Sequence, residues 1–179
     1  FCVAVMPVNA QNESDVARSD AIGIFDASGV QGGLVVHLGC GNGRLTAALK
    51  GGDAYIVHGL DANPANVDEA RRYVQSLDAY GPISIDPYQG DGLPYADNVV
   101  NLLVVEDGYN ISQEEVLRVL APLGVAYLNA DVLPAIIQKP WPNEIDEWTH
   151  YMHDASNNGV ANDSVIAPPK SLQWQCGPT

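Results

Sequence analysis

The sequence has 179 residues, of which 46% are hydrophobic, and a formal net charge of −14 from 8 Lys+Arg against 22 Asp+Glu. Such a composition indicates a folded chain, and the length suits one domain with a full core or a small domain plus part of another. The charge and the absence of a basic stripe argue against nucleic acid and against an anionic membrane surface as partners. Cys2, Cys40 and Cys176 have no C-x-x-C spacing, so we expect neither a disulfide framework nor a structural zinc site.

The amino-terminal stretch is apolar and ends in Val8-Asn9-Ala10, which puts small residues at the −3 and −1 places of a signal-peptide cleavage site. It is too short to span a bilayer, so we expect no membrane insertion. We expect residues 1–10 to be the remnant of a secretory signal peptide, which implies a periplasmic or secreted protein. The alternative is an edge strand or a frayed end, and then a cytoplasmic protein. Residues 11–30 are expected to form an amino-terminal helical segment, with a helix over residues 14–27.

Strands and helices are predicted to alternate from residue 34 to about residue 130. The apolar runs predict strands at 34–38, 54–60, 83–85, 99–105 and 124–128, and the periodic segments predict helices at 44–50, 64–77 and 113–120. This alternation predicts an α/β domain over residues 31–138. Its fold class is a Rossmann-like, doubly wound, mostly parallel sheet with helices on both faces.

Three glycines, Gly39, Gly41 and Gly43, fall between a predicted strand and a predicted helix. Glycine allows a tight turn and lets a ligand approach the backbone. Asp61 ends the second strand, where a carboxylate can accept hydrogen bonds from ribose hydroxyls, and Asp91 falls where the third strand should end. The carboxyl ends of neighbouring parallel strands share one crevice, so these groups predict a nucleoside pocket. A glycine turn with structural duties alone is the alternative.

These residues resemble the class I S-adenosylmethionine-dependent methyltransferases over roughly residues 31–130. Residues 35–43 are similar to the first motif of that family, 60–63 to the second, 90–97 to the third-strand segment and 115–124 to the helix and turn before the fifth strand. The resemblance implies S-adenosyl-L-methionine as a small-molecule cofactor and methyl transfer to an unknown acceptor, with Asp61 on the ribose and Asp91 on the adenine amino group. It assigns no catalytic residue. The cofactor-contact residues it implies are Gly39, Cys40, Gly41, Asn42, Gly43, Asp61, Ala62, Asp91, Gly92 and Glu106.

Several positions depart from the family pattern. His37 stands where the family usually has an acid that helps to hold the methionine ammonium, and a histidine cannot supply a fixed negative charge. The stretch 106–112 is short, and no strand is recognisable after Asp131, so we expect the final hairpin of the family to be missing. These departures favour a second hypothesis, a degenerate, non-catalytic binding or scaffold module. A nicotinamide-dependent oxidoreductase is less favoured, because the loop lacks the later glycine of that fingerprint.

Residues 139–179 differ in character and are expected to form a linker and the start of a second domain. Segments 144–155 and 168–174 resemble the beginning of a quinoprotein-like β-propeller in secreted bacterial multidomain proteins, which implies contact with a downstream propeller. Residues 144–153 are predicted to form a helix on which His150 and His153 share a face. With Asp154 they offer too few ligands for a zinc site, so we expect a structural role and no metal.

Overall fold

The computed structural model describes residues 8–90, 92–129, 134–153, 155–156, 159–161 and 164. The chain divides into two compact units, Phe1–Pro140 and Trp141–Thr179, each of which is considered by itself. All the helices and strands of the described residues belong to the first unit. None of the helices in the described part of the chain has the length and apolar character that crossing a membrane requires.

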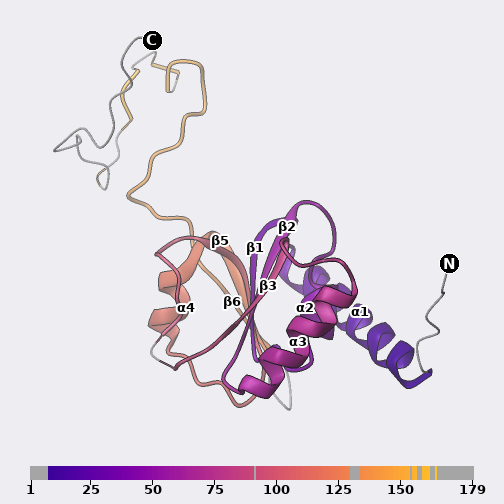
Figure 1. The fold of residues 1–179 in the computed structure, drawn as a ribbon. Helices are drawn as coiled ribbons and strands as arrows, with labels where there is room; N and C mark the ends of the chain where they lie inside the picture. Colours follow the sequence, from indigo (N-terminus) through magenta and orange to yellow (C-terminus); the bar gives the residue numbers. More distant parts are fainter. Residues whose placement is uncertain are drawn as a thin grey trace, which may run out of the picture. The chain divides into compact units, whose positions relative to one another are not determined.

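A six-stranded sheet forms the centre of the first unit (Figure 1). Its strands β1 to β5 run parallel and β6 runs antiparallel to β5, in the spatial order β3-β2-β1-β4-β5-β6. The strand order reverses at the β1–β4 boundary, so ligands are expected in the crevice outside the carboxyl ends of these strands. The predicted doubly wound, mostly parallel sheet is confirmed. The strands are β1 (Gly33–Leu38), β2 (Tyr55–Asp61), β3 (Ile83–Pro87), β4 (Val100–Val105), β5 (Leu120–Leu128) and β6 (Ala135–Gln138).

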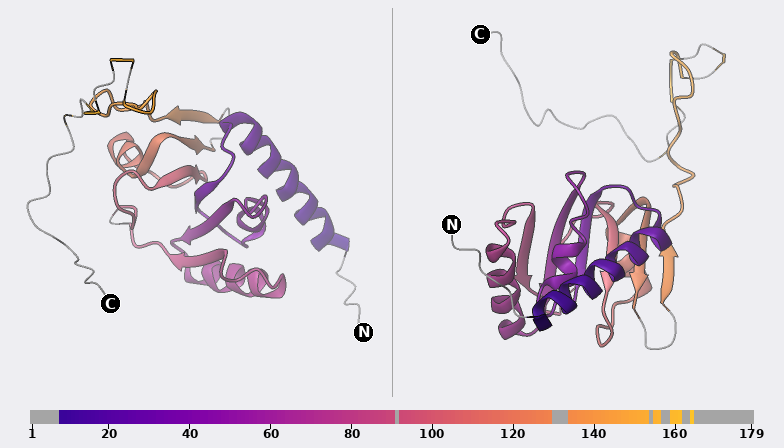
Figure 2. Two further views of the ribbon diagram at one scale, coloured as in Figure 1. Left: turned by 90° about the horizontal axis from the view of Figure 1, so that it is seen from above. Right: turned by 90° about the vertical axis from the view of Figure 1, so that its right-hand side faces the viewer.

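Helices cover both faces of this sheet. One face packs against α1 (Val8–Ser28), α2 (Arg44–Ala48) and α3 (Pro64–Ser76), and the other packs against α4 (Gln113–Val119). Successive side chains of a strand point to opposite faces, so Val35 of β1 is buried under the first group of helices and Val36 under α4. Figure 2 shows α1 as one long helix lying beside the sheet.

The amino-terminal helix is longer than the sequence pattern predicted. It begins at Val8 rather than at residue 14, and so enters the stretch expected to be a signal remnant; residues 1–7 lie outside the described residues. Its buried stripe consists of Ala17, Ala21 and Ile24, at spacings of four and three, whereas Val16 is 55% exposed. The sequence pattern suggested a rough apolar stripe of Val16, Ala17, Ile22 and Phe25, but Ile22 is also 55% exposed, and two of the three buried side chains are alanines, which stand out little in the sequence.

A short strand, β6, follows β5, although no strand was expected after Asp131. Its four residues pair with Val125 to Leu128 of β5 and extend the sheet by one antiparallel strand. The run is too short and too exposed to stand out in the sequence, and the pairing with β5 defines it. Among the described residues no second strand completes a hairpin with β6.

The helix expected at residues 144–153 is wrong. The backbone N–H groups of Thr149 and His150 both donate to the carbonyl of His153, at 2.9 and 3.2 Å, and this closes a tight turn in place of helical hydrogen bonds. His153 has a left-handed backbone, with φ of 61°, and its Nε2 lies 2.6 Å from Oδ2 of Asp146. His150 and His153 therefore face each other across a single bridge and share no helix face. In the described part of the chain no three His, Cys, Asp or Glu side chains are grouped to hold a metal, and Asp154 lies outside that part.

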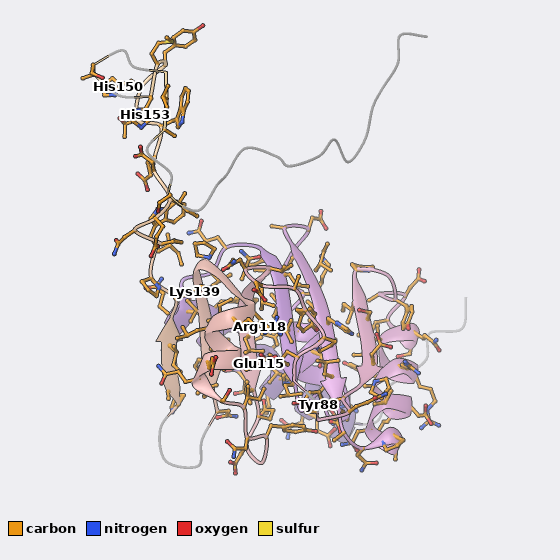
Figure 3. All side chains as sticks on the ribbon, turned by 90° about the vertical axis from the view of Figure 1, so that its left-hand side faces the viewer. Tyr88, Glu115, Arg118, Lys139, His150 and His153 are labelled. Carbon is orange, nitrogen blue, oxygen red and sulfur yellow. The ribbon has the colours of Figure 1, made fainter. Side chains whose placement is uncertain are left out.

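A charged network on α4 holds the loop that follows β3 (Figure 3). The guanidinium of Arg118 donates to both carboxylate oxygens of Glu115, at 2.7 and 2.8 Å, and to the carbonyls of Leu93 and Tyr95 in the loop. Glu115 also accepts the N–H of Leu93 at 2.7 Å. The bonds from Arg118 and then from Leu93 lower the pKa of Glu115 to about 2. This pair therefore fixes the loop at the carboxyl edge of the sheet.

We predict that Glu115→Gln lowers the free energy of unfolding by about 1–2 kcal/mol at pH 7, because a charge-assisted hydrogen bond is lost. The pKa of Glu115 is lowered by folding, so its stabilising effect is full above its ordinary value of 4.5 and is lost as the pH falls toward about 2. Urea unfolding at a series of pH values should show the deficit at neutral pH and its disappearance in acid. Glu114→Gln, on the same exposed turn of α4, is the control, and an equal deficit in both variants would contradict the assignment.

Candidate functional site

The loop between β1 and α2 contains three glycines in the left-handed region, with φ of 91° at Gly39, 51° at Gly41 and 79° at Gly43. A Cβ at Gly43 would lie 2.8 Å from Cβ of Ala70 on α3, so this glycine lets the loop pack on that helix. At Gly41 the nearest atom to such a Cβ is the carbonyl oxygen of Gly39, at 4.0 Å. Of the three, Gly41 is therefore the one whose surroundings leave room for a ligand to approach the backbone.

Asp61, the last residue of β2, binds this loop to the beginning of α3. Its Oδ2 accepts the N–H of Gly41 at 2.8 Å, and its Oδ1 accepts the N–H of Asn63 at 2.8 Å and the side-chain amide of Asn66 at 3.1 Å. The residue is 2% exposed. A buried carboxylate is costly unless it is hydrogen-bonded, and here three donors surround it. The predicted proximity of the glycine loop and Asp61 is thus present in the structure.

Tyr109, in the loop after β4, lies across the carboxyl ends of β1 and β2. Its hydroxyl accepts the N–H of Ala62 at 3.1 Å. A Cβ at Gly39 would lie 2.8 Å from Cε2 of its ring, so the absence of a side chain at Gly39 makes room for the tyrosine. Burial raises the pKa of Tyr109, and the nearby charge of Asp61 adds to the increase, so the phenol is neutral near pH 7. The ring of Tyr109 therefore lies against the backbone of Gly39, the first of the predicted cofactor-contact residues.

A second polar network lies behind the loop and joins β1, α2, β4 and β5. Nε2 of His37, which is 1% exposed, lies 3.3 Å from Oε1 of Glu106, and its Nδ1 lies 2.8 Å from the hydroxyl of Thr46. The amide of Asn129 donates to Oε2 of Glu106 at 2.9 Å. The hydrogen bond from His37 lowers the pKa of Glu106, partial burial opposes this, and Asn129 supports it. Glu106 therefore stays ionised beside the position where His37 replaces the acid usual in the family.

Gly92 lies in the loop after β3, in a neighbouring part of the carboxyl edge of the sheet. With Gly90, Tyr88 and Glu115 it lines a cavity of about 280 Å³ in front of α4. The ring of Tyr88 lies 6.0 Å from that of Tyr109, centroid to centroid, and this contact links the two parts of the edge. Asp91, the predicted adenine contact, lies outside the described residues. Its predicted role stays a prediction.

The side chains of two predicted loop residues, Cys40 and Asn42, make contacts within the protein. Cys40 is 3% exposed, and burial, with a smaller contribution from the charge of Asp61, raises the pKa of its thiol to about 12. That thiol is packed in the core, so Cys40 can offer a ligand only its backbone. The side-chain oxygen of Asn42 accepts the N–H of Arg44 at 3.1 Å, and so serves the first turn of α2.

Several residues of this edge were not recognised in the sequence. Asn63 and Asn66 follow Asp61 closely, and their spacing at the start of a predicted helix is a signal that could have identified them as its donors. Tyr109, Thr46 and Asn129 gave no such signal. They lie in three separate segments, and only the strand order of the sheet brings those segments together.

Comparisons with known proteins agree with this geometry. A family described as "Methyltransferase domain" matches residues 35–124. No curated protein matches the chain significantly. Many solved structures have a similar fold, and three of them illustrate the likeness. A candidate S-adenosyl-L-methionine-dependent methyltransferase from Methanococcus maripaludis has a TM-score of 0.57 at 20% identity, over 66% of this chain and 61% of that one. A SAM-dependent methyltransferase from Aquifex aeolicus has a TM-score of 0.55 at 20% identity, over 73% and 78%.

The third structure is geranyl diphosphate C-methyltransferase from Streptomyces coelicolor A3(2), in complex with Mg²⁺, geranyl diphosphate and S-adenosyl-L-homocysteine. Its TM-score is 0.55 at 18% identity, over 62% of this chain and 44% of that one. At such identities the likeness establishes the fold alone. The chain spans less than two thirds of the Methanococcus and Streptomyces proteins.

We predict that Gly43→Ala destabilises the domain by about 2–4 kcal/mol, because the new methyl group meets α3 and the backbone is left-handed. Denaturant unfolding of the variant measures this loss. Gly52→Ala is the matched control, since a Cβ there has no neighbour within 4 Å and φ at Gly52 is not in the left-handed region. Equal stability of the two variants would show that the loop does not depend on its packing against α3.

Proposed function

This chain belongs to the methyltransferase domain family, and from that premise we propose that it binds S-adenosyl-L-methionine between the loop 39–43 and Asp61. The observation that carries the proposal is the 2.8 Å bond from the N–H of Gly41 to the Asp61 carboxylate. It brings the glycine backbone and the acid to the same point, where parallel strands present a ligand crevice. The space at Gly41 and the family match support the same ligand.

The residues of this edge fit the cofactor in part. Asp61 offers four acceptor positions, of which three are used by the protein, so one is left for a ribose hydroxyl. A second hydrogen bond from the ribose to Asp61 requires the side-chain amide of Asn66 to leave Oδ1. Glu106 is another residue that the resemblance places at the cofactor. Its Cβ lies next to Gly39, and its carboxylate is held by His37.

When bound, S-adenosyl-L-methionine supplies a methyl group that its sulfonium already activates. The work of the protein is then to bind and to orient, and catalysis comes mainly from proximity. Asp61 and the loop backbone would fix the nucleoside end. Tyr109 would have to move from Gly39 for this site to fill, since its ring lies against the same backbone. A general base is not required of any residue in this scheme.

The second candidate is a non-catalytic, methyltransferase-like binding or scaffold module. The position of Tyr109 and the 2% exposure of Asp61 favour it, because both are what a closed crevice would show. His37 in place of the usual acid points in the same direction. The two candidates differ in whether the crevice opens for the cofactor, and this can be measured directly.

We predict that calorimetric titration of the 179-residue chain with S-adenosyl-L-methionine gives a dissociation constant between micromolar and millimolar. Asp61→Asn should weaken this binding about 5- to 150-fold, because a hydrogen bond to a charged acceptor is worth about 1–3 kcal/mol. Circular dichroism must show that the variant is folded. Asp68→Asn, exposed on α3, is the control and should bind like the unchanged chain. Absence of heat at millimolar ligand would leave the scaffold module as the function.

We further predict that Tyr109→Ala binds S-adenosyl-L-methionine more tightly, by about threefold or more. The reason is that affinity falls with the fraction of molecules in the competent state, and removal of the ring raises that fraction. Tyr80→Ala, whose exposed ring precedes β3 at the opposite edge of the sheet, is the control. If Tyr109→Ala weakens binding instead, the tyrosine is a ligand contact and does not obstruct the crevice.

We also propose that the protein is exported and continues into a quinoprotein-like propeller. The apolar first residues and the two tail segments described above support this, and the gene sequence on both sides of these residues tests it. A charged segment before Phe1 and repeated strand patterns after Thr179 are the expected results. A gene that lacks both would overturn this proposal and leave the cofactor site unaffected.

A further inference from the structure

A cavity of about 400 Å³ lies between α1 and the carboxyl ends of β4 and β5. This volume is within the range of small-ligand sites. Asp20 enters it from α1 and Glu106 from the end of β4, while Asn129 supplies an amide. Ile24, Leu45 and Tyr127 give part of the wall an apolar character. The cavity is on the α1 side of the glycine loop, and the nucleoside crevice is on the side of Asp61.

The charge of this cavity has one sign. Apart from the phenol of Tyr127, the ionisable side chains that the described residues contribute to its wall are two carboxylates, and no Lys, Arg or His is among these residues. Among the described residues none forms a hydrogen bond or an ion pair with the carboxylate of Asp20. Oε1 of Glu106 contacts the almost fully buried ring of His37, and its Oε2 accepts a hydrogen bond from the amide of Asn129. Two carboxylates around a partly enclosed space favour a cation.

We propose that this cavity binds a small amine, as its ammonium ion, with Asp20 and Glu106 as the anionic partners. The ligand has an apolar body, which fits the wall of Ile24, Leu45 and Tyr127, and it has no carboxylate. That this amine is also the methyl acceptor rests on the function proposed above. The binding of the amine does not depend on that function.

The charges of the lining also favour a simple amine over an amino acid as the ligand. The methionyl end of S-adenosyl-L-methionine carries a carboxylate next to its ammonium, and in this cavity that carboxylate would meet Asp20 and Glu106, with no Lys or Arg among the described lining residues to offset them. A simple amine meets no such repulsion. A simple amine and an amino acid can therefore be distinguished, because a carboxylate on the ligand should weaken its binding to this cavity.

As an acceptor, the amine must first release one proton to water. Its nitrogen lone pair then forms the new N–C bond to the methyl group, the C–S bond breaks, and the bonding electron pair stays on sulfur. The product is a methylated ammonium ion and a neutral thioether, so charge and atoms balance.

The test is a chemical-shift titration of the ¹⁵N-labelled 179-residue chain with phenethylamine. The amides of Gly23 and Asn129, which line the cavity, should shift. 2-Phenylethanol, which lacks the charge, and phenylalanine, which adds a carboxylate, should bind at least about tenfold more weakly. Equal binding of phenylalanine and phenethylamine would overturn the proposal and assign the cavity to an amino-acid end such as that of the cofactor.

Variants identify the partners. Asp20→Asn and Glu106→Gln should each weaken phenethylamine binding about threefold or more, while Asp26→Asn, exposed on the same helix and outside the cavity, should not. Unchanged binding in the first two variants would overturn the proposal. Titration with S-adenosyl-L-methionine keeps the two proposals apart. A chain that binds the amine but not the cofactor keeps this site and loses the proposed function, and the reverse result overturns this site alone.

Discussion

The carboxyl edge of the sheet depends on one buried carboxylate. Asp61 is almost inaccessible to water, and a charge in that position is stable only because the loop after β1, the first turn of α3 and the side chain of Asn66 all donate to it. These donors come from segments on both sides of β2. The same group that would recognise a ribose therefore also sets the shape of the glycine loop. Ligand binding and loop geometry cannot be changed independently at this residue.

The edge has two sides with different chemistry. On the side of β2 and β3, the ring of Tyr109 lies against the backbone at Gly39, and Gly90 and Gly92 are among the residues that line the nearby cavity. On the side of β4 and β5, Glu106 and Asp20 line a partly apolar cavity beside α1. His37, near the end of β1, holds Glu106 on the second side. In the sequence, His37 replaces an acid that is usual in the family, and the structure places the acid Glu106, which follows the neighbouring strand β4, beside it.

The fold leaves the acceptor open. Domains of this architecture support different chemistries, because the sheet positions the ligand edge and the surrounding segments decide what is bound there. In this chain those segments are α1, the short loop after β4 and the residues after β5. They carry Asp20, Tyr109 and Asn129, and these three side chains distinguish this edge from a bare nucleotide crevice.

The sequence by itself determined the succession of strands and helices along the chain from residue 34 to about residue 130, the mostly parallel character of the sheet, the glycine loop and the position of Asp61 at a strand end. These features are encoded locally, in apolar runs of a given period and in glycines at a turn. It did not reveal the start of α1, because a helix buried through Ala17 and Ala21 shows no strong apolar stripe. It also missed β6, whose four residues form a strand only because β5 offers its edge.

Only the tertiary structure decided which side chains meet at the site. His37 and Glu106 are 69 positions apart in the chain, and they meet because β1 and β4 are neighbours in the sheet. Tyr109, in the loop after β4, reaches Ala62 at the end of β2 across β1, which lies between these two strands, and Asp20 of α1 lines the same cavity as Glu106. Such contacts depend on strand order and helix docking, which no local pattern specifies. The residue types were visible in the sequence, and their pairing required the fold.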